Sequence, residues 1–256
     1  MDLVFDIGNT ETVVGLFTEG ELRSHWRLAS EPRRTVDEYG ILLRQLVVLA
    51  GVEPRDIRYA TVASVVPSLT QVLSGACSRY LSLDLDIIDA TTPLPIRLQV
   101  EEPLTVGADR IVNTLAARRL FAVDTIVVDL GTATTYDCIT HDGHFLGGVI
   151  APGVTTAAER LTDRTAKLPR VEVAQPGSVI GRRTETCLQS GVFYSAVDAI
   201  DGIVKRIQVE WDRPDALVVA TGGLSPMIGP ACSTVQRIEP FLTLHGVLFA
   251  REARTG

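Results

Sequence analysis

The chain carries one phrase twice, about half its length apart. Residues 3–22 read LVFDIGNTETVVGLFTEGEL, and residues 126–145 read IVVDLGTATTYDCITHDGHF. A single offset of 123 residues places Asp6 on Asp129, Gly8 on Gly131, Thr12 on Thr135 and Gly20 on Gly143. Each copy predicts an apolar strand, an Asp-x-Gly turn, a second strand and a hairpin tip. The repeat therefore predicts two like domains, each presenting one carboxylate and one hydroxyl-rich turn to a shared cleft.

The elements expected around the two copies repeat as well. Each half predicts three strands followed by helices that alternate with strands; Thr35, with Glu38 as its capping box, opens the first helix, and Gly51 ends it. This β-β-β-α-β-α order predicts an α/β protein made of two ribonuclease H-like domains with a central cleft. We expect the N-terminal domain to span residues 1–120 and the C-terminal domain, final helix included, residues 121–256.

Composition excludes several classes of protein. A formal net charge of −7 and a pI near 5.2, with no dense run of Lys or Arg, argue against nucleic acid as a partner. No window of 18 residues is apolar and uncharged, which argues against a membrane span, and no basic leader precedes the first strand. The four cysteines are scattered, as is typical of reduced thiols in a cytoplasmic protein.

The distribution of lysines excludes one kind of nucleotide site. The only lysines are Lys167 and Lys205, and neither follows a Gly-x-x-x-x-Gly segment. A Walker A loop is therefore impossible in this chain. If the protein binds ATP, other groups must hold the phosphates.

The first turn, Asp6 to Thr10, is suited to a phosphate chain and its metal ion. Small residues after a strand expose backbone N–H groups that can surround phosphate oxygens, and an Asp supplies an oxygen ligand that Mg²⁺ prefers. The alternative is an ordinary β-turn, in which the same residue types are common. The second copy at Asp129 to Thr135 favours the phosphate site.

A third segment, Gly107 to Arg110, is expected at the start of a helix. The N-terminus of a helix favours an anion nearby, and Asp109 beside Arg110 suggests a base for a hydroxyl next to a cation. The alternative is that Asp109 only complements the helix dipole. Residues 217–223, LVVATGG, predict a buried strand that ends in a glycine turn and could accept a flat base or ribose.

These segments together make the sequence similar to the type III pantothenate kinases, in the superfamily of acetate and sugar kinases, Hsc70 and actin. The resemblance extends from the first strand to the last helix. The motifs that carry it are DIGNT (6–10), ASVVP (63–67), EEPLTVGADRIVN (101–113), VDLGTATTYD (128–137), GGVIAPG (147–153), TAKLPRVE (165–172), ATGGL (220–224) and EPFLTL (239–244).

The resemblance implies a role for each motif. Asp109 is implied as the catalytic proton acceptor, and Asp129 as the ligand of a monovalent cation, K⁺ or NH₄⁺. Asp6 is implied to position Mg²⁺ through ATP. The implied ATP-binding residues are Asp6, Ile7, Gly8, Asn9, Thr10, Glu11, Thr12, Val13 and Thr132, and the implied substrate-binding residues are Val100, Gly107, Ala108, Asp109, Arg110 and Thr184. Val100 stands where members of the family often have Tyr, so it lacks that hydrogen-bond donor.

The activity implied is ATP-dependent phosphorylation of the primary hydroxyl of pantothenate to 4′-phosphopantothenate, the first step of coenzyme A biosynthesis. The family also implies a cytoplasmic homodimer, with no nucleic acid or membrane partner. Two alternatives stay open: a transcription-accessory or regulatory relative on the same fold without kinase activity, and a kinase for another small hydroxy acid.

Overall fold

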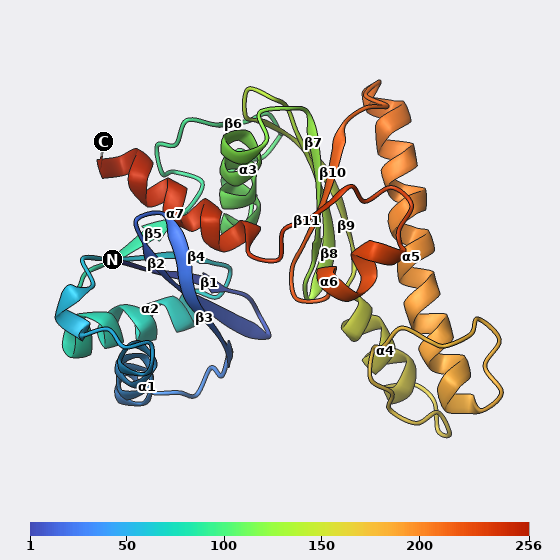
Figure 1. Cartoon of the computed structure of the whole chain (residues 1–256), viewed down its shortest axis with the longest axis horizontal. Coiled ribbons are helices and arrows are strands. Elements are labelled where there is room, and N and C mark those ends of the chain that lie inside the picture. The colour runs from blue at the N-terminus through green and yellow to red at the C-terminus, as the bar shows by residue number, and fades with distance from the viewer. Residues whose placement is uncertain (256) are drawn as a thin grey trace. The chain divides into compact units, whose positions relative to one another are not determined.

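The computed structural model describes residues 1–255 and contains two compact units. Unit 1 comprises Met1–Arg97, Glu101–Ala116 and the chain from Thr243 onward, and unit 2 comprises Leu98–Val100 and Ala117–Leu242. The expected domains, 1–120 and 121–256, remain a prediction. The compact units place the C-terminal helix with the N-terminal strands, because that helix packs on their sheet (Figure 1).

Unit 1 is built on a five-stranded mixed sheet in the order β3-β2-β1-β4-β5. The two hairpin pairs are antiparallel, whereas β1 pairs with β4 and β4 with β5 in parallel. The carboxyl ends of β1 and β4 therefore meet at one edge of the sheet. The strands are β1 (Asp2–Ile7), β2 (Glu11–Thr18), β3 (Glu21–Ala29), β4 (Tyr59–Ser64) and β5 (Leu85–Ile88).

Helices α1 (Val36–Leu49) and α2 (Pro67–Ala76) cover one face of this sheet, where they form a hydrophobic core with β1, β2 and β4 (Figure 1). The capping box predicted at Thr35 and Glu38 is present in both directions. On the other face, helix α7 (Leu242–Thr255) packs against β2, since a methyl group on Gly15 would contact Leu244 at 3.0 Å. Helix α3 (Ala108–Leu120) is packed in turn against α7.

Unit 2 repeats this topology. Its six-stranded sheet has the order β11-β10-β7-β8-β9-β6, in which β9-β8-β7-β10-β11 corresponds to β3-β2-β1-β4-β5. The extra strand β6 pairs at the β9 edge. The strands are β6 (Arg97–Leu98), β7 (Thr125–Leu130), β8 (Ala133–Ile139), β9 (His144–Pro152), β10 (Leu217–Thr221) and β11 (Arg237–Ile238).

Helices α4 (Val154–Asp163), α5 (Thr184–Trp211) and the short α6 (Ser225–Ile228) belong to unit 2. The second hydrophobic core places α5 against β7, β8 and β10 through Phe193, Val197, Ile200 and Val204. Their three- and four-residue spacing is the apolar stripe of an amphipathic helix. The sequence predicted this long helix, but it did not predict β11 or α6, which are too short to show a hydrophobic period.

The two copies differ in the length of their turns. Four residues separate the paired Ile7 and Thr12, whereas only three, residues 131–133, separate the paired Leu130 and Thr134. Thr134, rather than Thr135, therefore occupies the position of Thr12. The connection between β8 and β9 is in turn longer than the connection between β2 and β3. The offset of 123 residues therefore holds again at Gly143, whose φ of 87° matches the 86° of Gly20.

Candidate active site

The first predicted phosphate turn lies at the carboxyl end of β1. Asp6 is half-buried near the end of this strand, and Asn9 and Thr10 are exposed. Ile7 and Thr12 form the last pair of the β1–β2 ladder, and each is only 1% exposed. Of the predicted ATP-binding run Asp6–Val13, these two side chains therefore face the protein interior, and only the backbone of Ile7 and Thr12 is available to a ligand.

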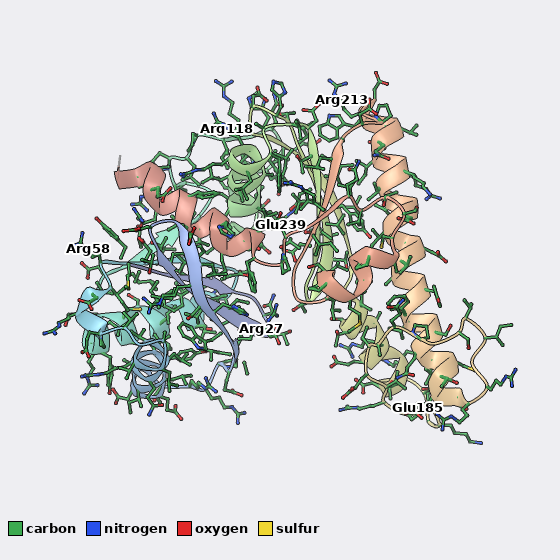
Figure 2. All side chains as sticks on the ribbon, in the orientation of Figure 1. Arg27, Arg58, Arg118, Glu185, Arg213 and Glu239 are labelled. Carbon is green, nitrogen blue, oxygen red and sulfur yellow. The ribbon has the colours of Figure 1, made fainter. Side chains whose placement is uncertain are left out.

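The carboxylate of Glu11, at the far end of this turn, is already paired. Its Oε2 accepts a hydrogen bond from Nη1 of Arg27 at 2.7 Å, and Figure 2 labels Arg27 on the neighbouring strand β3. The arginine offsets the negative charge of Glu11 beside the turn. A phosphate at the turn is therefore repelled less strongly than it would be beside an unpaired Glu11.

Asp109 lies in the first turn of α3 and folds back over Gly107. Its Oδ1 accepts a hydrogen bond from the N–H of Arg110 at 2.9 Å, and a methyl group on Gly107 would lie 2.5 Å from the same oxygen. Gly107 is therefore the residue that this carboxylate conformation requires. Burial raises the pKa of Asp109, and the backbone N–H and the positive charge of Arg110 only partly offset that rise.

The end of β4 connects the phosphate turn to Asp109. The N–H of Val65, directly after β4, donates to the carbonyl oxygen of Ile7 at 3.0 Å. A Cβ on Gly107 would lie 3.6 Å from Cγ1 of the same Val65. Within unit 1, the structure therefore brings the Asp6 turn and the Gly107–Arg110 segment to one edge of the sheet, although they lie about a hundred residues apart in the sequence.

The second turn, in unit 2, holds the carboxylate of Asp129 against a glycine. A Cβ on Gly222, after β10, would lie 2.5 Å from Oδ1 of Asp129. Thr221 precedes that glycine, is fully buried and is in parallel register with Asp129, so the two side chains share a face of the sheet. Its hydroxyl has no hydrogen-bond partner among the described residues. Thr132 is exposed on the turn itself.

Thr184 and Val100 lie elsewhere in unit 2. Thr184 is the first residue of α5 and contributes to the rim of an apolar cavity of about 580 Å³ between α4, α5 and the sheet. Tyr136, Leu161, Leu188 and Val192 are among the residues that line it. Val100 follows β6, and its Cγ1 lies 3.6 Å from the position that a Cβ on Gly147 would take. Neither residue lies in the second phosphate turn.

Sequence reasoning missed Ser30 and Thr221 as site residues. Ser30 contacts the first turn from a position twenty residues away, and only the length and register of β3 bring it there. The signal for Gly222 was present, because the glycine pair after a buried strand was noted as a possible contact for a base or ribose. The structure shows that Gly222 also leaves room for the Asp129 carboxylate, and the contact with a base or ribose stays a prediction.

Within residues 1–255, no helix is long and apolar enough to cross a membrane. Over the same residues, no three His, Cys, Asp or Glu side chains gather as a metal site. A cation at either turn must therefore complete its ligand set with backbone, hydroxyl, water or phosphate oxygens.

Comparisons with known proteins agree on one family. The family model described as type III pantothenate kinase matches residues 2–206. A curated protein of that name from Moorella thermoacetica is 45% identical to this chain over 257 residues, with 100% of each chain covered.

Solved structures match the fold at much lower identity. A protein from Campylobacter jejuni, described as a Baf family transcriptional activator, is 18% identical with a TM-score of 0.58, covering 99% of this chain and 98% of that chain. A ROK family glucokinase from Streptomyces griseus is 14% identical with a TM-score of 0.53, covering 99% and 100%. At such low identity these matches concern the fold and not the function. They confirm the prediction of an α/β protein with two ribonuclease H-like domains.

Proposed function

The chain belongs to the family of type III pantothenate kinases, which phosphorylate pantothenate in coenzyme A biosynthesis, and we propose how its own residues divide that reaction. The protein is a pantothenate kinase and uses ATP with Mg²⁺. The accessory or regulatory alternative is not favoured, because the relative of 45% identity and full coverage is named as a kinase. The observation that supports the residue roles is the placement of the Asp6 turn and Asp109 at one edge of the sheet of unit 1.

The first turn holds the phosphates of ATP. Phosphoryl transfer requires alignment and charge neutralisation more than covalent chemistry by the protein. Because the only two lysines lie outside any Walker loop, backbone N–H groups and hydroxyls of Gly8–Thr10 supply this grip. Asp6, a single half-buried carboxylate, suits Mg²⁺, which binds through one or two carboxylates plus phosphates and water. Bound there, Mg²⁺ supplies positive charge against the triphosphate.

Asp109 accepts the proton of the pantothenate hydroxyl, and the neighbouring Gly107, Ala108 and Arg110 bind the substrate. A carboxylate whose pKa is raised by burial is a stronger base than an ordinary aspartate. Arg110 supplies a fixed positive charge beside it, suited to the pantothenate carboxylate. Proton transfer occurs late, because an alcohol in its ground state is far less acidic than a carboxylic acid.

The second turn holds the monovalent cation. Asp129 is the charged ligand for K⁺ or NH₄⁺, and the buried Thr221 hydroxyl, which lacks a partner in the described chain, supplies a second oxygen. Thr132, exposed on the same turn, contacts ATP. Thr184 and Val100 contact pantothenate in a homodimer, and Val100 packs against it without a hydrogen bond. The dimer is cytoplasmic.

A coupled assay of ADP release tests the assignment. With Mg²⁺-ATP and pantothenate in potassium buffer, ADP release is expected to depend on pantothenate and to fall at least tenfold when Na⁺ replaces K⁺. A panel of polyols and other hydroxy acids serves as the control for acceptor specificity. Equal rates with an unrelated hydroxy acid contradict the substrate, and equal rates in Na⁺ contradict the cation site.

A further inference from the structure

The turn Gly8–Thr10 is held from outside by one serine. Inside the turn, the N–H of Gly8 donates to the carbonyl oxygen of Glu11 at 3.0 Å. From the end of β3, the hydroxyl of Ser30 donates to the carbonyl oxygen of Gly8 at 2.7 Å, and the N–H of Ser30 donates to that of Thr10 at 2.9 Å. Ser30 therefore fixes both ends of the turn.

The side chain of Thr12 completes this arrangement. Its Oγ1 lies 2.9 Å from Oγ of Ser30. A serine hydroxyl has a single proton, which here goes to Gly8, so Thr12 donates and Ser30 accepts. Thr12 is 1% exposed and Ser30 is 9% exposed, so water has little access to replace either bond. Removal of the Ser30 hydroxyl leaves the partly buried carbonyl of Gly8 and the buried hydroxyl of Thr12 without this partner, which is costly.

These bonds determine which way the peptide groups of the turn face. The N–H of a trans peptide points away from the carbonyl of the preceding residue, and the described chain contains no cis peptide. Because the carbonyls of Gly8 and Thr10 are directed at Ser30, the N–H groups of Asn9 and Glu11 point away from it. This is the orientation that backbone donors need in order to bind an anion.

The second turn also receives a hydrogen bond from outside, but from a different residue. Gly153 stands 123 residues after Ser30 and has no hydroxyl; a Cβ there would lie 2.2 Å from the carbonyl oxygen of Thr132. The hydroxyl of Thr156, on α4, donates to this same carbonyl at 2.8 Å. Both turns thus have an outside donor to a turn carbonyl, but only the first depends on a serine at the end of its third strand.

We propose that Ser30 is a positioning residue for ATP: it orients the Gly8–Thr10 turn so that its backbone N–H groups bind the phosphates. This inference rests on the proposed nucleotide role of that turn. It predicts a loss of ATP affinity that is separate from any loss of stability. Pantothenate affinity is expected to stay unchanged, because Gly107 lies against Val65, directly after β4, rather than against Ser30.

The test is a calorimetric titration of Mg²⁺-ATP into the full-length protein and its variants, in the absence of pantothenate. Ser30→Ala is expected to bind Mg²⁺-ATP about tenfold more weakly, since one buried hydrogen-bond partner is lost. Ser30→Thr, which keeps the hydroxyl, is expected to restore binding to within about threefold. Ser30→Cys, a weaker donor of similar size, is expected to fall between them and replaces Ser30→Ala if the alanine variant does not fold.

Thr125→Val is the matched control. Thr125 is fully buried in unit 2, and its hydroxyl donates to the carbonyl oxygen of Val123 at 2.8 Å, far along β7 from the turn at Gly131. This variant is expected to lose thermal stability and keep its ATP affinity. If Ser30→Ala, or Ser30→Cys in its place, behaves like Thr125→Val and binds Mg²⁺-ATP with wild-type affinity, Ser30 is only structural and the proposal is overturned. If the wild type binds ATP but does not phosphorylate pantothenate, the proposed function fails while the titration still decides the role of Ser30.

Discussion

Gly222 lies directly against the carboxylate of Asp129, so close that a methyl group on its α-carbon would be 2.5 Å from Oδ1. The same methyl group would be 2.8 Å from the carbonyl oxygen of Leu130, and the φ of Gly222 is 87°. We predict that Gly222→Ala displaces Asp129, lowers activity at least tenfold and shifts the activation by K⁺ to higher concentration. The measurement is the rate of ADP release as a function of K⁺ concentration.

Gly20→Ala is the control for backbone strain. Gly20 has a φ of 86°, and a Cβ there meets nothing within 4 Å. In each variant, alanine in the left-handed region lowers the stability of the folded state by about 1 kcal/mol. Only in Gly222→Ala does the new methyl group also collide with the carboxylate of Asp129. If both variants keep wild-type activity and the same K⁺ dependence, Gly222 does not position Asp129.

Asp201, on α5, is expected to make an acid-sensitive contribution to the stability of unit 2. Burial alone raises its pKa, but hydrogen bonds from the N–H and hydroxyl groups of Ser233 and Thr234 outweigh burial and lower it to about 2. A lowered pKa stabilises the folded state above the unfolded value, and this stabilisation is lost as the pH falls toward 2. We predict that Asp201→Asn costs on the order of 1–2 kcal/mol at pH 7, after allowance for solvent screening.

The measurement is urea denaturation of the wild type and Asp201→Asn at several pH values. The difference in the free energy of unfolding is expected to be constant from pH 7 to pH 5 and to shrink between pH 4 and pH 3. Asp198→Asn, an exposed position one turn earlier on α5, is the control and is expected to change stability by less than about 0.5 kcal/mol. A difference that grows as the pH falls contradicts this assignment.

Arg251 joins the C-terminal helix to the first strand. Its Nη2 lies 2.5 Å from Oδ1 of Asp2, with side chains only 16% and 11% exposed, and its guanidinium lies 4.7 Å from the ring centroid of Tyr59. Removal of one partner of a largely buried pair leaves the other charge uncompensated. Arg251→Met is therefore expected to destabilise unit 1 by about 3 kcal/mol, measured by urea denaturation.

The pair Arg254–Asp86 on the same helix is a matched comparison. It is as short, 2.5 Å, but its side chains are 36% and 35% exposed. Solvent screens such a pair, so Arg254→Met is expected to cost less than about 1 kcal/mol. If the two variants lose equal amounts of unfolding free energy, burial does not explain the contribution of the Arg251–Asp2 pair, and this prediction is contradicted.

Much of the fold could be predicted because its signals are local. The capping box at Thr35, the apolar spacing of α5 and the alternation of the hairpin strands are each contained in a short window of sequence. The duplication also predicted that the second sheet repeats the first. The equivalence of Thr12 with Thr135 was the part of this prediction that was wrong. The second turn is one residue shorter and places Thr134 opposite Leu130, and a constant offset between the two copies does not reveal that missing residue.

The parts of the site that depend on distant contacts could not be predicted. Ser30 reaches Gly8 only because β3 ends beside the start of β2, and Gly222 reaches Asp129 only because β10 pairs with β7. The sequence predicts the final helix over residues 240–254, in the second domain, because it follows the second sheet in sequence. In the structure this helix packs on β2 in unit 1, where Leu244 approaches Gly15 and the ring of His245 packs against Phe17.

The variant Asp109→Asn tests whether Asp109 is the base. Burial raises the pKa of this carboxyl, because the folded protein disfavours its charged form. The folded state is therefore more stable while Asp109 is neutral, and it loses this stability as the pH rises through the raised pKa and Asp109 ionises. A neutral amide avoids that cost. Asp109→Asn is therefore expected to be at least as stable as the wild type at pH 7, measured by urea denaturation.

The most direct measurement is the turnover number of Asp109→Asn with pantothenate and Mg²⁺-ATP, together with its affinity for Mg²⁺-ATP. Loss of a general base is expected to lower turnover by about 100-fold or more, with ATP affinity within about twofold of the wild type. A variant that binds ATP normally and turns over within tenfold of the wild-type rate contradicts the assignment of Asp109 as the base.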